Sequence, residues 1–174
     1  ANKVLTPLST AIENVDALNI FEQISLLPDF QIKTTLNTNA FRLHLSPLFL
    51  VAQDYSTLRI KNIISIYDSN NQDSKIIYQN LVDVTQNIPD EISLKTLGND
   101  TQTLSNLAQK LLSESLTLGL EDARNNLKQE KSLKTFKYSD AGKSSFERAH
   151  LVSKSCSKLV IRTLRNWIKS IPMT

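Results

Sequence analysis

Two runs of alternating apolar and polar residues, joined by a polar connection, constrain the fold of this chain most: LRIKNIISIYDSNNQDSKIIYQNLVDV, residues 58–84. Alternation with a period of two is typical of a strand with one buried face. The connection at 68–74 is entirely polar and too long for a two-residue turn. We therefore predict neighbouring antiparallel strands at 57–67 and 75–85. Their inward positions are Leu58, Ile60, Ile64, Ile66, Ile76, Tyr78, Val82 and Val84.

An isolated two-stranded ribbon is marginally stable in water, so we expect other elements to cover its apolar face. Apolar residues at helical spacing predict covering helices near 101–127 and from about 144 to 171. The same spacing predicts an amphipathic helix that begins near Thr6 and ends at Pro28 at the latest. Shorter alternating runs predict further strands around 32–36, 41–45 and 135–139.

These elements predict an α+β fold, in which an antiparallel β-sheet of about four to five strands has one face covered by long amphipathic helices. The chain has 174 residues, a length that suits a single domain at 1–174 with a sizeable core. The longest apolar stretch, LHLSPLFLVA at 43–52, is too short to cross a bilayer as a helix.

Composition argues against several classes of site. The chain has only three glycines, which disfavours a phosphate-binding loop. The stretch AGKSS at 141–145 resembles the end of such a loop, but Lys137 occupies the position of its first glycine. The net charge of +3 is mild and does not by itself indicate nucleic-acid binding.

Few residues are candidates for chemistry. His44 and His150 are the only histidines, and neither has a Cys, Asp or Glu at a metal-ligand or nucleophile spacing. Cys156 is the only cysteine and lies on the apolar stripe of the predicted last helix, so we expect a buried, unreactive thiol. Glu121 and Asp122 are expected to be solvated. We therefore predict no catalytic residue, no metal site and no cofactor.

Basic residues recur every three or four positions in the predicted last helix, at Lys154, Lys158, Arg162, Arg165 and Lys169. On a helix they would form one cationic face opposite the apolar stripe. Such a face is commonly only solvated. As a working surface it would suit an acidic protein partner or an anionic membrane. Nucleic acid is less favoured, because no aromatic residues are interleaved with the cations.

The order of strand, polar tip, strand and Leu/Ser/Gln-rich helix, carried by 58–68, 75–84 and 104–118, resembles small Gram-negative periplasmic and outer-membrane lipoproteins. The shared feature is an α/β layer like the amino-terminal domain of TolB. The resemblance covers about a third of the chain and contains no diagnostic motif. It implies a non-enzymatic role in the cell envelope with protein partners.

The chain opens at Ala1 without a methionine, which suggests that an upstream segment was removed, by signal cleavage or through the choice of the expressed region. No lipobox cysteine is visible. We expect an extracytoplasmic location in the periplasm, either free or anchored to a membrane through the removed segment.

Our first functional hypothesis is a non-catalytic cell-envelope binding or assembly protein that acts through protein–protein contacts. The alternative is a carrier that holds a small apolar ligand or lipid between a curved sheet and the C-terminal helix. An enzyme without a local motif ranks last. A cavity between sheet and helix would favour the carrier, and polar side chains converging on His44 or His150 would favour the enzyme.

Overall fold

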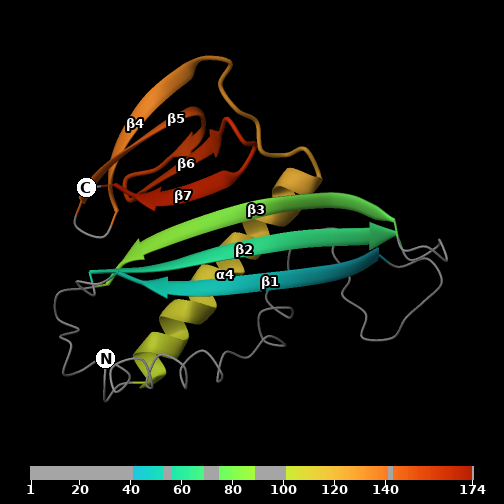
Figure 1. Cartoon of the computed structure of the whole chain (residues 1–174), viewed down its shortest axis with the longest axis horizontal. Coiled ribbons are helices and arrows are strands. Elements are labelled where there is room, and N and C mark those ends of the chain that lie inside the picture. The colour runs from blue at the N-terminus through green and yellow to red at the C-terminus, as the bar shows by residue number, and fades with distance from the viewer. Residues whose placement is uncertain (1–40, 53–55, 69–74, 89–100, 141–142, 174) are drawn as a thin grey trace.

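A computed structural model of the chain describes residues 41–52, 56–68, 75–88, 101–140 and 143–173. These residues form one seven-stranded sheet and one helix, α4 (Thr101–Ala123), which packs against β2 and β3 (Figure 1). The strands are β1 (Phe41–Val51), β2 (Thr57–Asp68), β3 (Ile76–Asn87), β4 (Leu133–Asp140), β5 (Lys143–Lys154), β6 (Lys158–Thr163) and β7 (Ile168–Pro172). Their order in the sheet is β1-β2-β3-β7-β6-β5-β4.

The predicted fold class is wrong. The sheet has seven strands instead of four to five, and it is mixed because β3 and β7 run parallel. The other neighbouring pairs are antiparallel, so two meanders, β1-β2-β3 and β4-β5-β6-β7, are joined through α4. The long helix predicted at 144–171 does not form. That segment is folded as β5, β6 and β7.

The error has a physical origin in strands that are buried on both faces. In β6, Val160 packs in the core under α4, whereas Ile161 packs in a second cluster on the opposite side of the sheet. Such a strand is a continuous apolar run, which periodicity cannot distinguish from a buried helix. A register shift between Leu151 and Ser153 also interrupts the alternation in β5. Asn166, at φ 66°, then supplies the turn into β7.

The predicted hairpin is confirmed. β2 and β3 pair antiparallel, with Ile60 opposite Val84 and Ile66 opposite Tyr78, so the predicted inward positions share one face apart from Ile76, which pairs with Tyr67 beyond a register shift and is 46% exposed. The predicted helix at 101–127 is confirmed as α4 but ends earlier, at Ala123. Asn125 has a φ of 58°, a left-handed conformation that commonly follows a helix end.

The remaining elements divide into two groups. The predicted strands at 41–45 and 135–139 are parts of β1 and β4. The predicted helix at 6–28 and the predicted strand at 32–36 lie outside the described residues.

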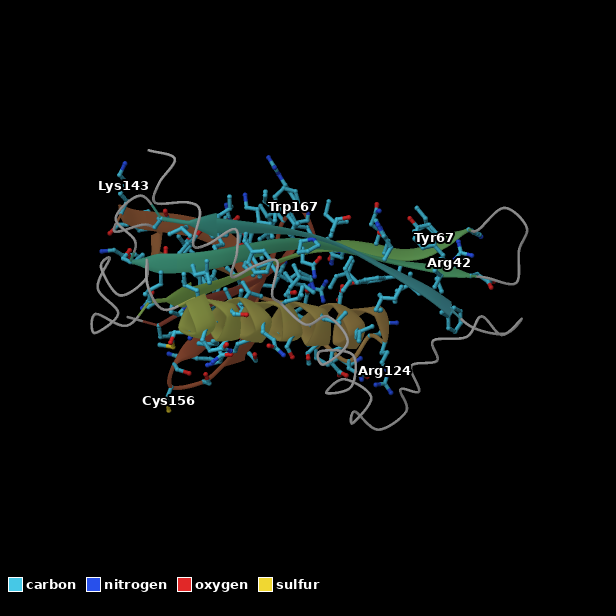
Figure 2. All side chains as sticks on the ribbon, turned by 90° about the horizontal axis from the view of Figure 1, so that it is seen from below. Arg42, Tyr67, Arg124, Lys143, Cys156 and Trp167 are labelled. Atoms are coloured by element: carbon cyan, nitrogen blue, oxygen red, sulfur yellow. The ribbon has the colours of Figure 1, made fainter. Side chains whose placement is uncertain are left out.

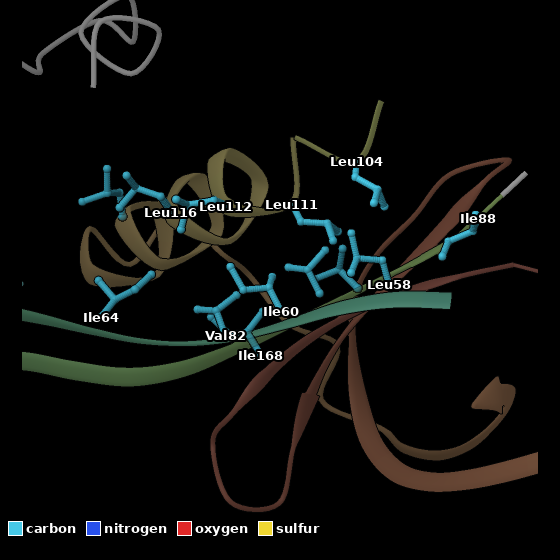
Figure 3. Packing of buried hydrophobic residues seen from close by; sticks show 13 residues of the cluster. Leu58, Ile60, Ile64, Val82, Ile88, Leu104, Leu111, Leu112, Leu116 and Ile168 are labelled. Atoms are coloured by element: carbon cyan, nitrogen blue, oxygen red, sulfur yellow. The ribbon is translucent and has the colours of Figure 1, made fainter. Parts of the chain in front are cut away.

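The main core lies between α4 and the sheet (Figure 3). Leu111 and Leu116 of α4 are fully buried against this face, as are Ile60 and Ile64 of β2. The helix comes close to β2 at Gly119, where an added Cβ would lie 2.2 Å from Cδ1 of Ile64. The side chains of the chain itself therefore fill the space between helix and sheet.

A second, smaller core lies where β4, β5, β6 and β7 curl together (Figure 1). Ala149, Ile161 and Ile171 are its buried members, and Phe136 and Leu151 pack against them. Because of this curl, Nζ of Lys169 in β7 donates to Oη of Tyr138 in β4 at 3.4 Å, across the two intervening strands. This second core explains why the C-terminal strands need no helix of their own.

β1 is an edge strand, and Pro47 lies in its middle. The Ala52 amide donates to the Thr57 carbonyl at 3.0 Å, so even-numbered residues of β1 bond to β2 and odd-numbered residues face the open edge. The nitrogen of Pro47, which carries no hydrogen, therefore faces away from β2. This placement keeps the β1–β2 ladder intact and removes a donor from the open edge.

The prediction that Cys156 is buried is wrong. Its side chain is exposed in the turn between β5 and β6, on the far side of the molecule from Trp167 (Figure 2).

We expect a thiol reagent to label Cys156 in the folded protein at nearly the rate seen in denaturant. A Cys156→Ser change should alter the free energy of unfolding by less than about 0.5 kcal/mol, because exposed substitutions rarely cost more. Strong protection from labelling in the folded state would contradict this placement.

Candidate functional site

A polar cluster joins the end of α4 to β3 and β6, and its centre is Asp122. The carboxylate of Asp122 accepts hydrogen bonds from Oη of Tyr78 at 2.8 Å and from Nδ2 of Asn80 at 2.9 Å. Arg162 donates to its other oxygen at 2.5 Å. The side chains of this ion pair are only 12% and 9% exposed for Arg162 and Asp122. Asp122 is therefore not solvated, contrary to the prediction for the acidic pair at 121–122.

The cluster shifts two pKa values in opposite directions. Burial alone raises the pKa of Asp122, but hydrogen bonds from Arg162, Asn80 and Tyr78 outweigh it and hold the pKa below its usual value of 3.8. Burial, followed by the hydrogen bond to Asp122, raises the pKa of Tyr78 far above its usual range. Near neutral pH the cluster therefore holds a carboxylate, a guanidinium and a neutral phenol.

The cluster borders an open hollow of about 700 Å³ that Tyr78, Asp122, Arg162 and Asn166 help to line. The carboxylate of Asp122 already accepts three donors, and Asn80 also donates to the Asn166 carbonyl at 2.9 Å. A carboxylate held in this way is a poor general base, because a proton would have to displace those donors. The cluster is best understood as a structural clamp between helix and sheet.

The two histidines do not meet each other, but His150 of β5 lies directly opposite Arg162 of this cluster. His44 lies on the edge strand β1, and Nδ1 of His150 lies 3.0 Å from the Glu130 carbonyl oxygen. The structure brings no group of three or more metal-ligating side chains together within the ranges it describes.

Of the five cations predicted to form one face, Lys154 is exposed at the end of β5, and the other four do not share a face. Lys158 pairs with Glu114, whose other oxygen accepts from Oγ of Ser170 at 2.7 Å. Arg162 pairs with Asp122 on the same side of the sheet as α4.

The other two cations lie elsewhere. Lys169 pairs with Glu147 at 2.5 Å. Burial alone lowers the pKa of Lys169, but the hydrogen bond to Glu147 and the further interactions with Tyr138 and Glu147 together outweigh it and raise the pKa. Arg165 lies in the β6–β7 turn, with its guanidinium carbon 5.0 Å from the centre of the Trp167 ring. Three of the four cations are therefore used in internal ion pairs, and Arg165 is the exposed one.

Arg165 marks the end of an apolar row on the face of β1, β2 and β3 turned away from α4, which we call the distal face. Ile168 of β7 packs under α4 and pairs with Val82, so the preceding Trp167 lies beside Leu81 on the distal face. Figure 2 shows Trp167 on the side of the sheet opposite α4. The row continues along the register through β3 and β2 to β1. We define the Trp167 row as Trp167, Leu81, Ile63 and Leu48.

The register places the members of the row next to one another. Leu81 is directly opposite Ile63, and Ile63 is opposite Ser46, two residues from Leu48 on the same face. Ile63 is 44% exposed and Leu48 is 55% exposed, whereas Leu81 and Trp167 are partly buried. Apolar side chains that line up across three strands on an exposed face are typical of a contact surface.

Charged residues flank the row. Lys61 of β2 lies between Leu48 of β1 and Asp83 of β3, and Arg165 stacks on Trp167, so a cation lies near each end of the row. The acid on this part of the face, Asp83, is bound by Arg59, with Nε donating at 2.6 Å. The distal face therefore combines an aromatic anchor and aliphatic neighbours with positive charge.

None of the row's four residues was singled out from the sequence, although a signal was present. In a strand with one buried face, adjacent apolar residues place one of them on the outer face. The pairs Ile63–Ile64 and Leu81–Val82 do this in β2 and β3. Trp167 could not be found in this way, because its segment was assigned to a helix.

Comparisons with known proteins yield no relative. The chain matches no known protein family, no curated protein and no solved structure at a significant level. Within the described ranges, no helix has both the length and the apolar character needed to cross a membrane.

Proposed function

We propose that this protein is a non-catalytic binding or assembly protein of the cell envelope, and that it binds a protein partner on its distal face. The observation that carries the proposal is the Trp167 row, which places Trp167 beside Leu81 of β3 and Ile63 of β2, with Leu48 diagonally next on β1, on a face that α4 does not cover.

The composition of the row suits protein recognition. Tryptophan and arginine are enriched among the residues that contribute most to binding free energy, and here Arg165 stacks on Trp167. The row runs from the middle of the sheet to its β1 edge, and the other face of these strands packs on the main core. A rigid surface loses little conformational entropy when a partner binds.

Two further considerations favour binding over the other hypotheses. The apolar space between α4 and the sheet is occupied by the chain's own side chains, which favours a surface contact over a carried ligand. The polar cluster around Asp122 is internally paired, which favours a binding role over catalysis. The envelope location rests on the resemblance to periplasmic and outer-membrane lipoproteins alone.

The test compares variants of the row in the native organism. We expect the tagged protein to capture one partner in near-stoichiometric amounts, and a Leu48→Glu/Ile63→Glu double variant to reduce that capture at least about tenfold, because a desolvated carboxylate in an apolar contact is costly. A matched control is Phe146→Glu on β5, where the native side chain is 66% exposed and lies outside the row.

Three outcomes decide the proposal. Selective loss of the partner in the row variant, with unchanged thermal unfolding, supports it. Equal capture by the row variant and the wild type would refute a role for the distal face. Fractionation of the same cells tests the location, because recovery of the complex only with cytosolic proteins would exclude the envelope.

A further inference from the structure

We propose that the segment bound by the distal face is an acidic amphipathic helix that lies across the strands, with its apolar stripe on the Trp167 row. This inference rests on the proposed function and specifies the chemistry of the partner. It is carried by the direction of the row and by the cations at its two ends.

The direction of the row suits a helix. From β7 to β1 the row makes three steps between neighbouring strands, each of about 4.8 Å, and so spans about 14 Å. At about 1.5 Å per residue, a helix covers this span with about ten residues. Apolar residues spaced three and four apart would then meet the row along its length.

An added strand fits less well. A strand that extends the sheet would pair with the backbone of β1 at its open edge and could contact only Leu48 of the row. Pro47 also removes a donor from the middle of that edge, which weakens such pairing.

The charges select an acidic partner. Asp83 is paired with Arg59, and Glu147 with Lys169. Asp83 lies directly opposite Lys61 but binds Arg59, and the structure shows no ion pair of Lys61 or Arg165 with a carboxylate among the residues it describes. Carboxylates flanking an apolar stripe would meet these two cations, one at each end of the row. A second copy that docked with the same face would bring the same cations together, which is unfavourable.

The chain offers a built-in probe, because Trp167 is its only tryptophan and lies in the row. We would titrate the protein with a tryptophan-free helical peptide of about 18 residues, with leucines three and four apart and flanking glutamates. The matched control peptide has every glutamate replaced by lysine. Trp167 fluorescence reports binding, and backbone amide shifts report where the peptide lies.

We expect the acidic peptide to change Trp167 fluorescence and to shift amides of β1, β2 and β3, while the basic peptide does neither. Its dissociation constant should rise at least about fivefold between about 50 and 500 mM NaCl, because the salt screens exposed charges. A Lys61→Glu/Arg165→Glu variant should bind the acidic peptide at least about tenfold more weakly than the wild type does, and it should bind the basic peptide.

Other results would overturn the inference. These are no binding at millimolar acidic peptide, equal binding of both peptides, or amide shifts outside the distal face. A response of Trp167 to phosphatidylglycerol vesicles but not to the peptide would point to a lipid surface, and a response to protein concentration alone would point to self-association.

The native capture experiment separates the two proposals. If the Leu48→Glu/Ile63→Glu variant loses its native partner but the acidic peptide does not bind, only the chemistry assigned to the partner is wrong. If native capture is unaffected as well, the proposed function itself is wrong.

Discussion

Replacing Asp122 with alanine is expected to lower the free energy of unfolding by about 3 kcal/mol, as measured by urea denaturation. The change leaves the guanidinium of Arg162, whose side chain is 12% exposed, without its carboxylate. Removing one member of a largely buried ion pair typically costs about 3–5 kcal/mol. Tyr78 and Asn80 also lose the acceptor of their hydrogen bonds. The value expected is at the low end because the cluster borders an open hollow that water can enter.

The neighbouring acid provides the control. Glu121 pairs with Arg124 at 3.6 Å, and both side chains are about a third exposed. A Glu121→Ala change should therefore cost less than about 1 kcal/mol, as exposed pairs usually do. Similar losses for the two variants would contradict the view that Asp122 is the centre of a structural clamp.

The stability lost in the Asp122→Ala variant should depend on pH, and the pKa of Asp122 gives the direction. The pKa of Asp122 is lower in the folded protein than its usual value of 3.8. A depressed carboxyl pKa contributes stability above the unfolded value, and that contribution is lost as pH falls through the folded value. The stability difference between wild type and Asp122→Ala should therefore hold from pH 7 to about 4 and shrink below it. A difference that stays constant to pH 2 would show that the charge of Asp122 does not matter.

Replacing Leu111 with alanine is expected to cost about 3 kcal/mol of unfolding free energy. Leu111 is fully buried in the main core, where α4 packs on β2 and β3. Truncation of a buried leucine removes its transfer free energy and leaves a cavity, and the two effects typically total about 2–5 kcal/mol. Urea denaturation with an unchanged slope would show that the loss reflects native packing.

Lys110, the residue before Leu111, provides the matched control. Lys110 is exposed on the same turn of α4, so Lys110→Ala should change stability by less than about 0.5 kcal/mol. If Leu111→Ala had as small an effect, the described packing of the helix on the sheet would be incorrect.

The local sequence pattern was sufficient to predict the elements that have one buried face and one exposed face. At the start of β2, Leu58 and Ile60 alternate with Arg59 and Lys61, and period two with one apolar face specifies both the strand and its orientation. α4 likewise has one apolar stripe and an exposed polar side. In these elements the contrast between core and solvent is visible in the residues themselves, so both could be predicted.

Only the tertiary structure determined the rest. β6 is apolar on both faces because a separate core packs on each side of the sheet. The sequence of one strand does not show how many of its faces are covered, so β6 could not be recognised as a strand. The same holds for the candidate site. Asp122 meets Arg162 from 40 residues away, and Trp167 meets Leu81 only because β7 pairs in parallel with β3. Which side chains become neighbours across strands depends on strand order and register, and these are set by long-range packing that no local spacing records.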